Sequence, residues 1–100
     1  MAVAEQARAV LDLAKLHLPP SPRVVGIEAE PYVDSTGEDA LRLWVLLEES
    51  TDVDRISGKA VILLKEAIHD ALLRSGITEF PYISLVKPSE RAELAQDVEE

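Results

Sequence analysis

The residues of this chain whose types could do chemistry are few and scattered. A loop carries Glu48, Glu49, Asp52 and Asp54, and carboxylate oxygens are the ligands that hard divalent cations prefer. Its residues do not fit a calcium-binding loop, because serine, glycine and leucine follow where ligands and a final glutamate are needed. We therefore interpret the loop as solvated residues that favour the start of a helix. A metal- or ligand-sensing regulatory domain that uses residues 48–54 is the alternative.

Two shorter patterns match parts of known sites. Glu66 and His69 form a Glu-x-x-His step, the half-motif of di-metal sites in helical bundles, but a complete site needs a second step and two more glutamates. Residues 57–59 (Ser-Gly-Lys) match the end of a phosphate-binding loop, yet Val53 stands where the first glycine is required. The chain has no cysteine and no recognisable pair of nucleophile and base. We predict no catalytic residue, no metal site, no cofactor and no enzymatic activity.

Trp44 is the residue that the surrounding pattern explains least. Its strand, residues 41–48, has an apolar residue at every odd position, as a half-buried strand does (Leu41, Leu43, Val45 and Leu47). Trp44 and Leu46 point to the other side, where a solvent-facing strand normally carries polar groups. Two large apolar side chains there predict that something covers this face.

The elements around this strand are predicted from periodicity and turn residues. A helix is expected over residues 3–18, where apolar residues recur at steps of three and four before a proline cluster. Further strands are expected at 23–32 and 79–87, with a turn at 34–39. A second helix is expected within 55–75. It would begin near Lys59, be capped by one of four residues and end at Gly76 (the cap candidates are Ser50, Thr51, Asp52 and Asp54).

Residues 1–87 are thus predicted to form one α+β domain. The order α-β-β-α-β gives a two-layer sandwich, with two helices on one face of a three-stranded sheet. The acidic tail, residues 88–100, is expected either to form a short helix capped by Ser89 or to be disordered.

This arrangement leaves the second face of the sheet open. If Val25, Ile27 and Ala29 lie under the helices, alternation turns five apolar groups outward, and these form the predicted interface (Val24, Trp44, Leu46, Tyr82 and Val86). Such a patch has an area of roughly 500 Å². We predict a homodimer joined through this face, because symmetric pairs are the commonest oligomers. A tail that folds back over the sheet is one alternative, and bases of RNA stacked on the aromatic rings are another.

Charge argues against that last alternative. Nineteen acidic residues against ten basic ones give a net charge of −9, which repels phosphate backbones and anionic membrane surfaces. We predict neither nucleic acid nor a membrane as partner. Charges interrupt the first 18 residues, and no apolar run is long enough to span a membrane, so a cytoplasmic location is expected. The predicted function is a small acidic interaction module, with an accessory subunit of an enzyme or toxin-type system as a further alternative.

The element order is similar to that of two known families. The cytoplasmic C-terminal domains of cation diffusion facilitators share it and pair into dimers, but this chain lacks the metal-ligand histidines of that family. Bacterial KH-type domains are similar in outline. Their Gly-x-x-Gly clamp has no counterpart, because the four glycines are isolated (Gly26, Gly37, Gly58 and Gly76). The resemblance implies a fold only, and no functional residue follows from it.

Overall fold

A computed structural model describes residues 3–13, 16–19 and 22–98 of the chain. Its elements follow in the order α1 (Val3–Val10), β1 (Val24–Val33), β2 (Asp39–Leu47), the 3₁₀ turn η1 (Val53–Arg55), α2 (Gly58–Arg74), β3 (Phe80–Val86) and α3 (Pro88–Val98). The predicted α+β class and α-β-β-α-β order are confirmed, and the tail adds a third helix. Helix α1 ends at Val10, well before the predicted end at Leu18. Ala14 of that predicted helix and Pro20 of the proline cluster after it lie outside the described residues.

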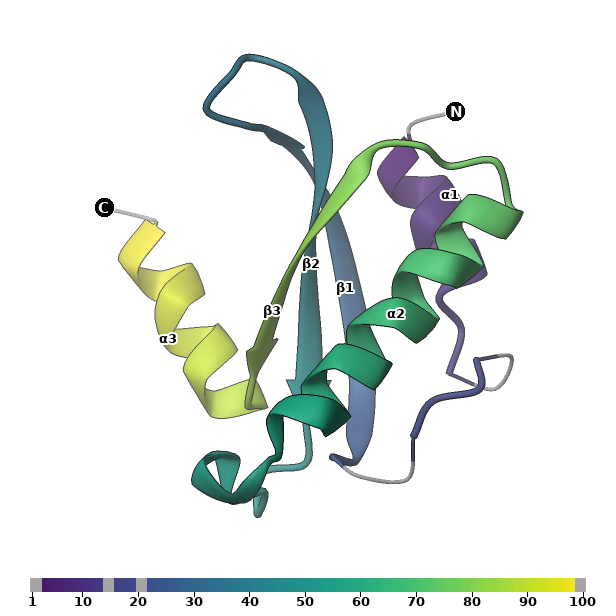
Figure 1. The fold of residues 1–100 in the computed structure, drawn as a ribbon. Coiled ribbons are helices and arrows are strands. Elements are labelled where there is room, and N and C mark those ends of the chain that lie inside the picture. The colour runs from purple at the N-terminus through teal and green to yellow at the C-terminus, as the bar shows by residue number, and fades with distance from the viewer. Residues whose placement is uncertain (1–2, 14–15, 20–21, 99–100) are drawn as a thin grey trace.

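The three strands form one mixed sheet in the order β1-β2-β3. Strands β1 and β2 are antiparallel, whereas β2 and β3 are parallel. A parallel pair needs a crossover connection, which α2 supplies. Helices α1 and α2 lie on one side of the sheet, as predicted, and α3 lies on the other (Figure 1). Within the described residues, no helix combines the length and the apolar character needed to cross a membrane.

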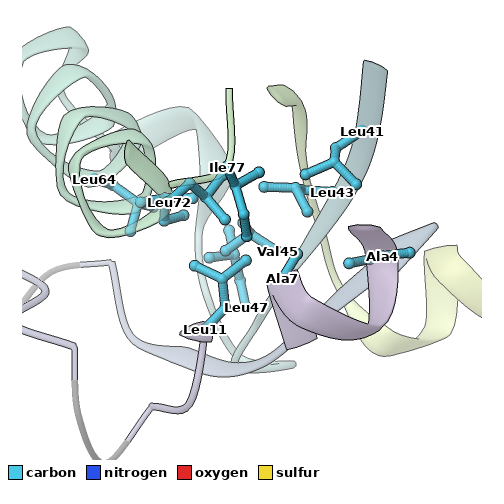
Figure 2. Close-up of a cluster of buried hydrophobic side chains, with 12 residues drawn as sticks. Ala4, Ala7, Leu11, Leu41, Leu43, Val45, Leu47, Leu64, Leu72 and Ile77 are labelled. Atoms are coloured by element: carbon cyan, nitrogen blue, oxygen red, sulfur yellow. The ribbon is translucent and has the colours of Figure 1, made fainter. Parts of the chain in front are cut away.

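The hydrophobic core lies between the sheet and the first two helices (Figure 2). The odd positions of β2 are fully buried, as their alternation predicts, and α2 contributes residues spaced by four (Leu41, Leu43, Val45 and Leu47 from β2; Leu64, Ile68 and Leu72 from α2). Helix α1 packs Ala4 and Ala7 against this cluster. The strands and both helices are therefore held in place from one side of the sheet.

Local hydrogen bonds set both ends of α2. The hydroxyl of Ser57 accepts from the backbone N–H of Ala60 at 3.1 Å, so Ser57 is the N-cap. The predicted caps were wrong: Asp52, for example, caps η1 instead. At the other end Gly76 has a φ of 81°, and the N–H of Ile77 donates to the carbonyl of Leu72 at 3.0 Å. This is the glycine-dependent helix end predicted from the sequence.

Strand β1 departs from strict alternation near its start. A bulge between Val24 and Gly26 inserts an extra residue opposite β2. Val24 therefore packs against the core, and Val25 is 47% exposed. The prediction that Val24 faces away from the helices and Val25 toward them was wrong, because one inserted residue reverses the faces of its neighbours.

Candidate functional site

The chain itself covers Trp44, the centre of the predicted interface. The side chain is only 8% exposed. The guanidinium groups of Arg42 and Arg91 each lie 4.5 Å from the centroid of its ring. The indole N–H donates to a carboxylate oxygen of Glu30 at 3.2 Å. Stacked cations and a satisfied N–H allow the ring to be buried on a face that carries few other apolar groups.

Helix α3 provides this cover. Arg91 donates to the Glu28 carboxylate at 2.8 Å, and the backbone N–H and hydroxyl of Ser89 donate to Glu49, both at 2.9 Å. Ser89 is therefore a tether to the loop after β2, and the expectation that it caps α3 was wrong. The helix begins at Pro88, and Glu90 accepts from the backbone N–H of Lys87 at 2.9 Å. Proline first and glutamate third are favourable at a helix start.

The other members of the predicted interface do not form one patch. Leu46 and Val86 are register partners on the α3 side and are half-buried. Tyr82 lies further toward the start of β3 and is 39% exposed. Val24 belongs to the core side because of the bulge. Three of the five residues are thus gathered near α3, and a role in an interface stays a prediction for each.

The two edge strands of the sheet differ sharply in how accessible their backbones are. At β1, the guanidinium of Arg8 donates twice to the carbonyl of Ala29, at 3.1 and 2.7 Å. Pro31 also lacks a backbone N–H, and the bulge further disturbs this edge. These are devices that prevent an edge strand from pairing with another chain.

The outer edge of β3 has no such protection over most of its length. Residues 82–86 contain neither a charge nor a proline, and β3 pairs with β2 without a register shift. Among the described residues, β2 is the only strand that pairs with β3. Half of the backbone groups in such a strand point away from its neighbour and are available to another strand.

A groove of about 440 Å³ follows this edge of β3 (its lining is Lys65, Glu66 and His69 of α2, with residues 80–84 of β3). Phe80, in its lining, is 57% exposed. Ile62 and Leu73 share a stripe of α2 with Glu66 and His69 by helical spacing, and they are 57% and 51% exposed. The Phe80 ring packs edge-to-face on Tyr82, at 4.9 Å between centroids, and lies 6.1 Å from His69. An apolar stripe thus runs from α2 to the open strand edge.

This surface was missed at the sequence level, although a signal was present. Ile62 and Leu73 fall outside the apolar stripe of α2 that faces the core, and a helix with apolar residues on its outer face often contacts a second surface. The strand order was not available from the sequence. Without it, β3 could not be recognised as an edge.

The acidic loop, by contrast, is occupied by interactions within the chain. Glu48 lies 3.4 Å from Arg23, Glu49 accepts from Ser89, and Asp52 lies 3.3 Å from Arg55. In the part of the chain that the structure describes, no three His, Asp or Glu side chains are grouped as metal ligands. The loop therefore ties neighbouring elements together.

A second polar cluster lies at the turn between β1 and β2. The Asp34 carboxylate accepts from the Thr36 hydroxyl at 2.6 Å and from the backbone N–H of Glu38 at 3.0 Å. These hydrogen bonds lower the pKa of Asp34. Tyr82 donates to the same carboxylate at 3.4 Å. Partial burial and the negative charge of Asp34 raise the pKa of Tyr82.

Comparisons of the chain with protein-family models, with curated proteins and with solved structures found no match.

Proposed function

We propose that this chain is a protein-interaction module that forms a homodimer by pairing β3 with β3 of a second copy. The observation that carries the proposal is the difference between the two edges of the sheet. Arg8 and Pro31 protect β1, whereas the edge of β3 is unpaired in the described structure. An exposed edge strand is a ready template for another strand.

Antiparallel pairing of identical strands generates a two-fold axis, the commonest symmetry of protein dimers. Two three-stranded sheets would join into one sheet of six strands. Because the axis is perpendicular to the sheet, α2 and its copy would lie on the same face and run in opposite directions. The exposed Ile62, near the start of α2, would then approach the exposed Leu73, near the end of the copy's α2. Phe80 would lie opposite the end of the copy's β3.

The available surface is sufficient for a dimer of moderate affinity. A stable interface buries roughly 800 Å² of each partner. The half-exposed large side chains beside β3 would contribute roughly 300 Å², and the strand edge and groove would supply the rest. The net charge of −9 opposes association, but the groove places Lys65 next to Glu66. Each copy can therefore offer a cation to a carboxylate of the other.

The face around Trp44 is a less favourable dimer interface, because α3 already occupies it. The acidic loop offers no comparable support for a metal-sensing role, since its carboxylates are engaged within the chain. A cytoplasmic location and the lack of enzymatic activity stay predictions from the sequence.

The mass of the protein in solution tests the proposal. We expect a dimer by light scattering at roughly 100 μM, a concentration well above the micromolar dissociation constant of a moderate interface. The double variant Ile62→Glu/Leu73→Glu should be a folded monomer, because both side chains are at least half exposed and would place like charges across the axis. A wild-type monomer at that concentration would contradict the proposal.

A matched control adds the same charge at the protected edge. Val25 and Val33 of β1 are 47% and 61% exposed, so Val25→Glu/Val33→Glu should leave the dimer intact. If both double variants are monomers, added charge rather than the β3 surface controls association.

A further inference from the structure

Arg91 occupies a built site on the α3 side of the sheet. Its side chain is only 24% exposed, the least of any arginine in the ion pairs found among the described residues. The guanidinium stacks on Trp44 and pairs with Glu28. An indole face and a carboxylate together recognise the two main features of a guanidinium, its flat surface and its charge. A depression of about 260 Å³ adjoins this site, with Glu30 and Arg8 in its lining.

In the part of α3 whose side chains the structure describes, the residues after Arg91 make little apolar contact with the sheet. Leu94 is 39% exposed, and the other side chains described beyond Arg91 are exposed as well (Ala92 and Glu93). Ser89 is held through hydrogen bonds on the surface. Surface ion pairs and hydrogen bonds of this kind contribute little to stability, typically about 1 kcal/mol or less each. Replacing α3 by another helix at this face would therefore cost little free energy.

Half-buried apolar groups lie beside the arginine site. Leu46 and Val86 are adjacent across β2 and β3, and acidic residues surround them and Trp44 (Glu28, Glu30, Glu48 and Glu49). This combination favours a cationic ligand with an apolar side and repels an acidic one.

We propose that this face is a docking site for a helix of another protein, that the helix presents an arginine to Trp44 and Glu28, and that α3 fills the site in cis. Arg91 is the only basic residue of α3, and it is the residue that enters the site. A partner helix with an arginine at that place, and with apolar residues over Leu46 and Val86, would make the same polar contacts and bury more apolar surface. It must compete with an attached helix, whose effective concentration is of millimolar order.

This surface shares only Val86 with the β3 edge and uses its side chain rather than its backbone, so the proposal does not depend on the homodimer. Helix α3 lies on the opposite side of the sheet from α2 (Figure 1). A chain that is monomeric could still dock a helix at Trp44, and a dimer would carry two such sites.

Trp44 is the only tryptophan of the chain and reports directly on the site. The test uses the full-length protein, its Arg91→Gln variant and a synthetic peptide of residues 87–98. We expect the variant to show a changed Trp44 emission, because its own α3 no longer holds the ring. Added peptide should restore the wild-type emission, and it should bind the variant at least about tenfold more tightly than the wild-type protein, where α3 competes in cis.

Three comparisons make the result decisive. The same peptide with Arg91→Gln should bind the variant at least about tenfold more weakly, as joint loss of a partly buried ion pair and a cation–π contact would cause. Adding Glu28→Gln to the Arg91→Gln protein should weaken binding of the wild-type peptide by a similar factor. Arg55→Gln, at an exposed arginine in η1, should leave Trp44 emission unchanged.

Two outcomes would overturn the proposal. If peptide at several times the millimolar effective concentration of α3 leaves the emission of the Arg91→Gln variant unchanged, the face accepts no helix in trans. If the Arg91→Gln variant loses its folded circular dichroism spectrum altogether, α3 is an integral part of the domain and not an exchangeable cover.

Discussion

Single residues on the outer face of this sheet combine roles that are usually separate. Trp44 is buried, as an apolar residue should be, but the groups against its ring are the charged ends of Arg42 and Arg91. Arg42 lies 3.9 Å from Glu30, and Glu30 also accepts from the indole N–H. The cations therefore keep their charge partners while their flat surfaces exclude water from the ring.

Asp34 provides a test at the residue scale through its lowered pKa. A carboxyl whose pKa is lower in the folded state than its ordinary value of 3.8 stabilises the fold above that value. This stabilisation is lost as pH falls through the folded-state pKa. We expect Asp34→Ala to be less stable than the wild type at pH 7, and the difference to shrink below pH 3.8. Urea unfolding at pH 7 and at a pH below 3.8 measures this difference in stability.

The control for that experiment is Ser35→Ala, an uncharged change in the same exposed turn. Its effect on stability should not depend on pH. A difference between Asp34→Ala and the wild type that persists unchanged into acid would show that the carboxylate charge contributes nothing to the turn.

The residues near Trp44 show how far the sequence could predict this surface. Trp44 and Leu46 lie on the side of β2 opposite the core, as the alternation predicts, and a cover is present. The tail folding back over the sheet, one of the alternatives, is the cover that the structure shows. Arg91 itself could not be singled out, because it is distant in sequence and lies in a segment with few apolar residues. Val24 was misplaced because the bulge depends on how β1 pairs with Leu46 and Leu47, which is a tertiary property.

At the scale of elements, α2 shows which local rules were sufficient. The glycine at its end was predicted correctly, since a positive φ at Gly76 is costly for other residues. Its start was predicted to within one residue, but its cap was not, because several neighbouring residues are good caps and only the observed backbone selects Ser57. The segment that partly matches a phosphate-binding loop is this cap followed by the first turn of the helix.

Ser57 therefore supports a prediction at the scale of the helix. Ser57→Ala removes the acceptor for the N–H of Ala60 and should lower the free energy of unfolding by about 1 kcal/mol. Ser50→Ala, at one of the caps expected from the sequence, should change it by less than about 0.5 kcal/mol, because its hydroxyl bonds only to exposed Glu48. Equal losses in urea unfolding would show that Ser57 is not the dominant cap.

At the scale of the whole molecule, the two sides of the sheet differ in how they are covered. The side under α1 and α2 is sealed by apolar packing, whereas the other is covered by a helix that is attached through polar groups. The sheet also has one protected edge and one open edge. The proposed association would therefore use a surface separate from the core, so variants at the open edge should change assembly without disturbing the core.

Thermal unfolding tests this separation for the molecule as a whole. A dimer that dissociates when it unfolds becomes more stable with rising protein concentration, by mass action. For a chain of 100 residues, a tenfold rise in concentration should raise Tm by roughly 2–5 °C. The Ile62→Glu/Leu73→Glu variant should show no such dependence, and its Tm should match that of the wild type at high dilution. If the wild-type Tm is constant while the protein is dimeric, the chains would associate without contributing to the stability of the fold, and strand pairing through β3 would be contradicted.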